Sequence, residues 1–116
     1  MGRLTTHVLD TANGCPGAGI RIELFRIGTD GNPVASVITN TDGRCDKAML
    51  EGEAFTRGEY ELVFHAGDYF KDKGQQPGDH PFLNHVVVRF SVSEPHEHYH
   101  VPLLLSPFGY STYRGS

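Results

Sequence analysis

The sequence contains no tryptophan, only two cysteines and no long apolar run. A membrane-spanning helix needs about 20 consecutive apolar residues, and the chain offers no such stretch. The two cysteines, Cys15 and Cys45, are not part of a C-x-x-C motif, which argues against a zinc site or a thioredoxin-like redox centre. Basic residues are also few, since 10 Lys and Arg stand against 14 Asp and Glu. The net charge of -4 argues against binding to nucleic acid or to an anionic membrane.

We also expect no secretory leader, because the first ten residues contain no apolar segment of the kind that a signal peptide carries. We therefore expect a cytoplasmic protein whose two thiols are reduced. The length of 116 residues is typical of one domain. We expect residues 1–116 to form a single domain whose hydrophobic core needs no disulfide.

Long stretches with helical periodicity are absent, whereas short β-rich runs alternate with turn signals such as Asn-Gly and Asp-Gly. This pattern predicts about eight short strands, in an all-β sandwich or barrel. The exception is residues 68–82, whose first half is predicted to form one or two helical turns.

Alternation within two predicted strands separates a core face from an outer face. In the strand near residue 100, the odd positions are apolar and are predicted to face the core: Tyr99, Val101, Leu103 and Leu105. The even positions begin as histidines and end as apolar residues: His96, His98, His100, Pro102 and Leu104. Near the N-terminus, His7 shares a face with Thr5 and Leu9. Buried histidines need hydrogen-bond partners, so both faces are expected to border a half-buried site at a subunit interface.

Four segments then stand out: LTTHVLD (4–10), TDGR (41–44), HYHVPLLLSP (98–107) and YRGS (113–116). Together with GDYF and PFGYSTY, they resemble the transthyretin-like family, and most closely its 5-hydroxyisourate hydrolases. The resemblance covers essentially the whole chain, and the final YRGS is specific to the hydrolase branch. It implies a transthyretin-like sandwich of two four-stranded antiparallel sheets with one short helix. It also implies a homotetramer, a dimer of dimers, with active sites at the dimer–dimer interface.

The activity implied by the resemblance is a step of urate degradation in purine metabolism. The cyclic amide of 5-hydroxyisourate is hydrolysed to 2-oxo-4-hydroxy-4-carboxy-5-ureidoimidazoline. The implied catalytic residues are His7, Arg44, His100 and Ser116. The implied substrate-binding residues are Arg44, Tyr113, Arg114 and Gly115. Histidine is suited to remove a proton from water near neutral pH, and a guanidinium can stabilise the oxyanion that forms. No metal or organic cofactor is expected, and the small-molecule substrate is the expected partner.

Several alternatives stay open at this point. Either histidine could be the base, and Ser116 could act through its hydroxyl or through the terminal carboxylate. His98 shares the face of His100 and at most supports it. The alternation of His96, His98 and His100 also suggests adventitious zinc binding, although histidines four apart on a strand lie about 13 Å apart and cannot share one ion. The alternative function is a transthyretin-like small-molecule carrier, because one fold can host both activities.

Overall fold

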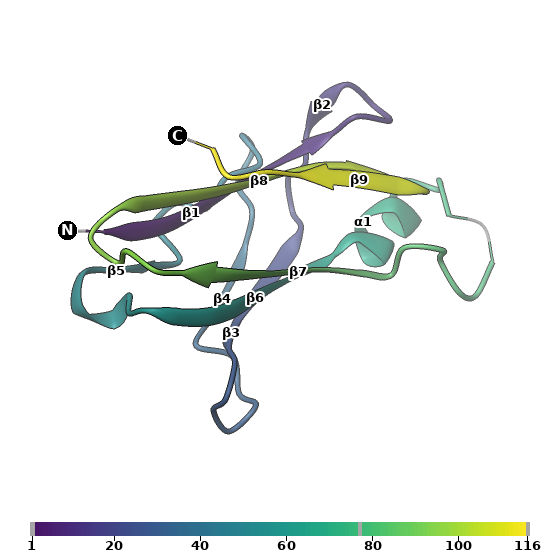
Figure 1. Ribbon diagram of the computed structural model, residues 1–116. Helices are drawn as coiled ribbons and strands as arrows, with labels where there is room; N and C mark the ends of the chain where they lie inside the picture. Colours follow the sequence, from purple (N-terminus) through teal and green to yellow (C-terminus); the bar gives the residue numbers. More distant parts are fainter. Residues whose placement is uncertain (1, 77, 116) are drawn as a thin grey trace.

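The computed structural model describes residues 2–76 and 78–115, which form two β-sheets packed face to face and one α-helix (Figure 1). One sheet has five strands: β1 (Arg3–Asp10), β2 (Cys15–Pro16), β5 (Leu50–Glu51), β8 (His98–Ser106) and β9 (Gly109–Thr112). The other has four: β3 (Arg21–Arg26), β4 (Ala35–Ile38), β6 (Gly58–His65) and β7 (His85–Val92). The helix α1 (Ala66–Asp72) follows β6, and a 3-10 turn, η1 (Gly52–Ala54), follows β5.

This architecture confirms the predicted fold class of a two-sheet sandwich with one short helix. Two details differ from the expectation of four-stranded antiparallel sheets. The short strands β2 and β5 both pair with β1, which brings the first sheet to five strands. In addition, β1 and β8 run parallel. They come from opposite ends of the chain, so the long connection that parallel strands require is available. No helix in the described part of the chain is long and apolar enough to cross a membrane.

The core lies between the two sheets and follows the predicted alternation. Even positions of β1 and odd positions of β8 are buried, including Leu4, Val8, Leu103 and Leu105. They pack against buried side chains of the opposite sheet, including Ile22, Leu24, Leu62 and Phe64. Burial of one such side chain stabilises the fold by about 1.5–3 kcal/mol relative to its exposure. The helix α1 adds Tyr69 and Phe70 to this core.

The outer face of the β1–β8 pair carries the predicted histidines. The parallel register places Thr5 opposite His100, Arg3 opposite His98 and His7 opposite Pro102. His7 and His100 therefore lie on the same face, one diagonal step apart, as the parity of the two strands predicts. The pairing of β1 with β8 brings together residues more than 90 positions apart in the chain.

Candidate functional site

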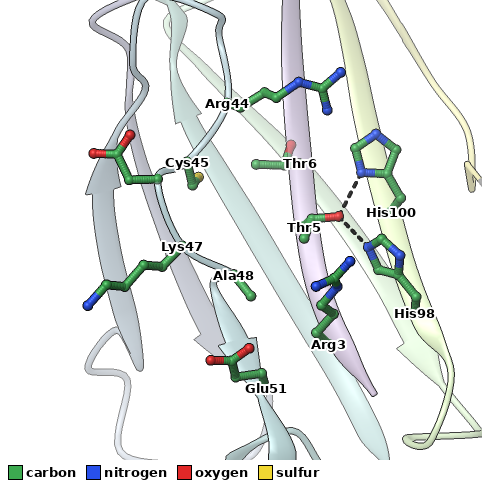
Figure 2. Close-up of a pocket in the computed structure, with 11 residues that line it drawn as sticks. Arg3, Thr5, Thr6, Arg44, Cys45, Lys47, Ala48, Glu51, His98 and His100 are labelled. Carbon is green, nitrogen blue, oxygen red and sulfur yellow. Dashed lines mark hydrogen bonds between the residues drawn. The ribbon is translucent and has the colours of Figure 1, made fainter. Parts of the chain in front are cut away.

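A pocket of about 660 Å³ opens where the edge of β1 is incompletely paired. On this edge, His7 forms a backbone bridge with Arg44, and Leu4 pairs with Leu50. The segment 45–48 loops away from β1 between these two contacts. Figure 2 shows the resulting gap, with β1 and β8 on one side and this segment on the other. The lining comprises Arg3, Thr5, Thr6, Arg44, Cys45, Asp46, Lys47, Ala48, Glu51, His98 and His100. The volume is in the range of sites for small molecules.

A rigid turn presents Arg44 to this pocket. The side-chain oxygen of Asn40 accepts hydrogen bonds from the backbone N–H groups of Asp42 and Arg44, at 2.9 and 3.1 Å. Such Asx interactions favour tight turns. Gly43 has a φ of +75°, and a Cβ atom there would lie 2.4 Å from the Val8 carbonyl oxygen. Only glycine satisfies both the positive φ and the close approach. The Arg44 side chain then extends across β1 toward His100 (Figure 2).

His7 is held by the same turn. Its Nε2 atom lies 2.8 Å from the carbonyl oxygen of Asp42. A carbonyl oxygen can only accept, so Nε2 must carry a proton and donate it. In the neutral ring the lone pair is consequently on Nδ1. His7 is half-buried, does not itself line the pocket, and touches it through the backbone bridge to Arg44.

His100 lines the pocket and is half-buried on β8. Its Nδ1 atom lies 2.8 Å from the Thr5 hydroxyl, which also lies 2.6 Å from Nε2 of His98 (Figure 2). Burial, together with the positive charge of Arg44, lowers the pKa of His100. Burial, Arg3 and Arg114 lower the pKa of His98 in the same way. Both rings are therefore neutral at near-neutral pH, the form in which a histidine can accept a proton.

The chain after β9 runs beside β8 and reaches His100. The Gly115 N–H donates to the His100 carbonyl oxygen at 2.7 Å. Arg114 stacks on the Tyr99 ring with its Cζ atom 3.9 Å from the ring centroid, and it donates to Glu97 at 2.9 Å. This cation–π contact and ion pair hold the segment in place. A Cβ atom on Gly115 would lie 2.7 Å from Cδ2 of His100, so glycine is required for the ring to keep its position.

The structure thus separates the predicted site residues into three groups. Arg44 and His100 line one pocket, and His7 is bridged to Arg44. Tyr113 and Arg114 line a different, smaller hollow between β7 and the end of the chain. Ser116 lies outside the described residues.

Sequence reasoning missed Thr5 and the cationic side chains of Arg3 and Lys47, all of which line the pocket. Alternation alone places Thr5 and Arg3 on the outer face with His7, which is a usable signal. The approach of Lys47 depends on the path of the loop and has no comparable signal.

The histidine-rich face is smaller than alternation suggested. His96 lies in the turn before β8, so only His98 and His100 belong to the strand. Their ring centroids are 6.0 Å apart. Within residues 2–76 and 78–115, no group of three or more His, Cys, Asp or Glu side chains could hold a metal ion.

Cys45 brings a thiol, a potential nucleophile, to the pocket. Its burial and the neighbouring charge of Asp46 raise its pKa to about 11. The thiol therefore stays protonated near neutral pH, and a protonated thiol is a poor nucleophile. The groups suited to chemistry here are the neutral imidazoles and the guanidinium. They can accept a proton from water and stabilise a developing negative charge.

Comparison with known proteins adds to this geometry. The profile described as the HIUase/Transthyretin family matches residues 4–115. The chain belongs to the HIUase/transthyretin family. The match includes β1, the turn that carries Arg44, the histidines of β8 and the chain up to Gly115, so every described site residue except Arg3 lies within the family region.

Two named 5-hydroxyisourate hydrolases match this chain over nearly their whole length. The 5-hydroxyisourate hydrolase of Pseudomonas aeruginosa is 57% identical, over 100% of this chain and 93% of that protein. The structure of Klebsiella pneumoniae 5-hydroxyisourate hydrolase has a TM-score of 0.81 and 31% identity, covering 98% of this chain and 99% of that chain. A crystal structure of (S)-allantoin synthase has a TM-score of 0.92 and 47% identity, covering 99% of this chain. This chain spans only 44% of the length of that synthase.

Proposed function

We propose that the protein hydrolyses 5-hydroxyisourate to 2-oxo-4-hydroxy-4-carboxy-5-ureidoimidazoline, a step of urate degradation. The observation that carries the proposal is the meeting of Arg44 and His100 in one pocket, in a chain 57% identical to a named 5-hydroxyisourate hydrolase. A small-molecule carrier needs only a pocket whose shape is complementary to its ligand. The neutral imidazole and the guanidinium found here are groups suited to hydrolysis, and they favour the enzyme over the alternative of a small-molecule carrier.

The reaction needs an activated water and a site for negative charge. In the proposed mechanism, Nε2 of His100 removes a proton from water, which attacks the ring carbonyl carbon. The carbonyl oxygen becomes an oxyanion, and the Arg44 guanidinium stabilises it and orients the flat substrate through paired hydrogen bonds. The C–N bond then breaks, and the proton passes to the leaving nitrogen. The lowered pKa of His100 keeps its ring available as a base near pH 7.

His7 is proposed to support this chemistry from its place beside Arg44 on the edge of β1. Because its Nε2–H donates to the Asp42 carbonyl, its remaining nitrogen, Nδ1, is the one able to exchange a proton. We propose that His7 assists proton transfer to the leaving nitrogen. It also adds positive charge beside His100 when it is protonated.

The residues after β9 are proposed to act mainly by holding the site together. Arg114 is engaged by Tyr99 and Glu97, and Gly115 packs against the His100 ring. Ser116, the residue that follows Gly115, remains a proposed catalytic group that orients a histidine or the water. Tyr113 remains a proposed substrate contact that a neighbouring subunit would have to complete, because it lies outside the main pocket. No metal or organic cofactor takes part in the proposed steps.

We also propose a homotetramer, a dimer of dimers, located in the cytoplasm. The support is that the outer face of the β1–β8 pair ends in the half-buried apolar residues Leu9 and Leu104. Sedimentation equilibrium would test the tetramer, and fractionation of the producing cells would test the location.

The proposed activity is tested by generating 5-hydroxyisourate from urate with a urate oxidase and following its ultraviolet decay. The expected result is faster decay with the protein than without it, and a loss of this acceleration in His7→Ala, Arg44→Ala and His100→Ala. Decay at the spontaneous rate in the presence of the wild-type protein would leave the carrier function as the better explanation.

A further inference from the structure

The Thr5 hydroxyl lies between two imidazole rings on the outer face of the sheet. Its oxygen is 2.6 Å from Nε2 of His98 and 2.8 Å from Nδ1 of His100. The arrangement follows from the parallel register, because Thr5 pairs with His100 and the neighbouring Arg3 pairs with His98. Figure 2 shows both rings directed at the one hydroxyl, at the side of the pocket.

One hydroxyl has one proton, so Thr5 can donate to only one of the two rings. The other ring must then donate to Thr5. If Thr5 donates to His98, the Nδ1 atom of His100 carries a proton and its Nε2 atom keeps a lone pair. If Thr5 donates to His100, the proton of His100 is on Nε2, and this atom cannot act as a base. Thr5 can also accept from both rings when its own proton points elsewhere. When His98 accepts the Thr5 proton, His100 has to donate from Nδ1, and its Nε2 atom is then the available nitrogen.

We propose that His98 is a positioning residue for the hydrolysis: it accepts the Thr5 proton and thereby keeps His100 protonated on Nδ1, with Nε2 free as the base. The inference rests on the proposed function and extends it to two residues that do not themselves have to touch substrate. It assigns Thr5 as the link between the two rings.

The surrounding charges favour this arrangement. His98 faces Arg3 from β1 and Arg114 from the segment after β9, and both oppose a positive charge on its ring. His100 faces Arg44 from the turn and His7 from β1. A neutral His98 can accept the Thr5 proton. Protonation of His98 on Nε2 turns that atom into a donor, which ends its role as acceptor and releases the constraint on His100.

The test uses nitrogen-15 NMR of the histidine rings in the unliganded protein, which reports the protonated nitrogen of each ring without any substrate. In the wild-type protein we expect His100 to carry its proton on Nδ1. Thr5→Val removes the hydroxyl at nearly constant shape, and we expect His100 to become a mixture of the two tautomers. A lost hydrogen bond of this type changes an equilibrium by up to about tenfold, so we expect kcat to fall by up to about tenfold with little change in KM. Thr5→Ser restores the hydroxyl and is expected to restore the His100 tautomer.

His98→Leu provides a second test at an exposed position, and His96→Leu is its matched control in the adjacent turn. We expect His98→Leu to change the tautomer of His100 and to shift the midpoint of the acid limb in the pH dependence of kcat. We expect His96→Leu to change neither. If Thr5→Val does not fold, the His98→Leu spectrum decides.

Two results would overturn the proposal: a proton on Nε2 of His100 in the wild-type protein, or an unchanged His100 tautomer in whichever of these variants folds. A wild-type protein that fails to accelerate 5-hydroxyisourate decay would refute the proposed function instead, and the ring spectra would still report the hydrogen-bond chain.

Discussion

The two ends of β1 each carry a polar cluster, and the clusters differ in how completely their hydrogen-bonding capacity is used. At the end of the strand, the buried Asp10 carboxylate accepts hydrogen bonds from the Tyr69 hydroxyl, the Asn13 side chain and the backbone N–H groups of Ala12 and Asn13. Near the start, Thr5 joins two histidines whose remaining nitrogens are left for the pocket. A buried polar group whose hydrogen-bonding capacity is fully used stabilises the fold. A nitrogen with a free lone pair beside a cavity can accept a proton during a reaction.

The pKa shifts of Asp10 and His100 also differ between the two clusters. Burial alone raises the pKa of Asp10, but the hydrogen bonds from Asn13, Tyr69 and Ala12 outweigh it, and the net pKa is lowered. Asp10 is therefore held in its charged form. His100 is held in its neutral form by burial and by Arg44. The first effect stabilises a permanent charge for structure, and the second preserves a base for catalysis.

Outside the histidine cluster, the largest expected effect is the loss of activity in Arg44→Ala. Removal of a group that stabilises an oxyanion typically lowers turnover by about 10²–10³-fold, and we expect a loss of this size in kcat/KM. The melting temperature should change little, because the side chain is exposed. Arg44→Lys keeps the charge without the planar fork and should recover only part of the activity. Arg21→Ala, on the other sheet, is the control; equal losses in both variants would contradict the assignment.

The next effect concerns stability at the other end of the strand. Asp10→Ala leaves the buried Tyr69 hydroxyl without its partner, and we expect the free energy of unfolding to fall by about 2–4 kcal/mol in urea titrations. Because the folded pKa of Asp10 is lowered, its stabilising contribution is present above the unfolded value near pH 4 and is lost as the pH falls through the folded value. The same titrations on the exposed Asp68→Asn should give a change within about 0.5 kcal/mol. A similar change in both variants would show that the Asp10 cluster is dispensable.

A smaller effect is expected from Gly115→Ala, which connects the chain end to the catalytic cluster. The added methyl group would lie 2.7 Å from Cδ2 of His100 and must displace the ring. A displacement of the base should lower kcat by about tenfold. Gly109→Ala is a matched control, because its Cβ atom would meet only the Ser106 hydroxyl at 3.8 Å. Unchanged kcat in Gly115→Ala would mean that the His100 position is not critical.

The smallest effect is a shift of the pH profile. Since the pKa of His100 is lowered, the ring stays neutral below the ordinary histidine value of about 6.5. The acid limb of kcat/KM should therefore have its midpoint below pH 6.5. Arg44→Lys retains a positive charge and some activity, so the midpoint of its acid limb should also stay below pH 6.5. A wild-type midpoint above pH 6.5 would contradict the assignment of His100 as the base.

Much of the fold was predictable from local patterns. The strand β1 coincides with the run RLTTHVLD, and alternation in β8 separates the buried Tyr99 and Val101 from the outward His98 and His100. These predictions succeeded because side-chain direction in a strand has a period of two. Alternation also places His7 and His100 on the outer faces of their own strands, whereas their common face depends on the pairing of β1 with β8.

The site itself was only partly predictable, because it depends on long-range register. Which residue of β1 lies opposite His100 is set by pairing across 95 positions of the chain, and a shift of one residue would reverse the faces. The contact of Thr5 with two rings could not be read from either strand alone. The path of residues 45–48 away from β1 and the stacking of Arg114 on Tyr99 likewise depend on tertiary packing. Asp10 carried a usable signal, since Asp followed by Thr-Ala-Asn is typical of a turn.

The most direct test of this account compares the two ends of β1 in one assay. The ultraviolet decay of 5-hydroxyisourate would be followed with His100→Gln and with Asp10→Asn, each at the same concentration of folded protein. We expect a loss of about 10²–10⁴-fold for His100→Gln, down toward the spontaneous rate, and near wild-type turnover for Asp10→Asn. Wild-type turnover in His100→Gln would contradict this expectation.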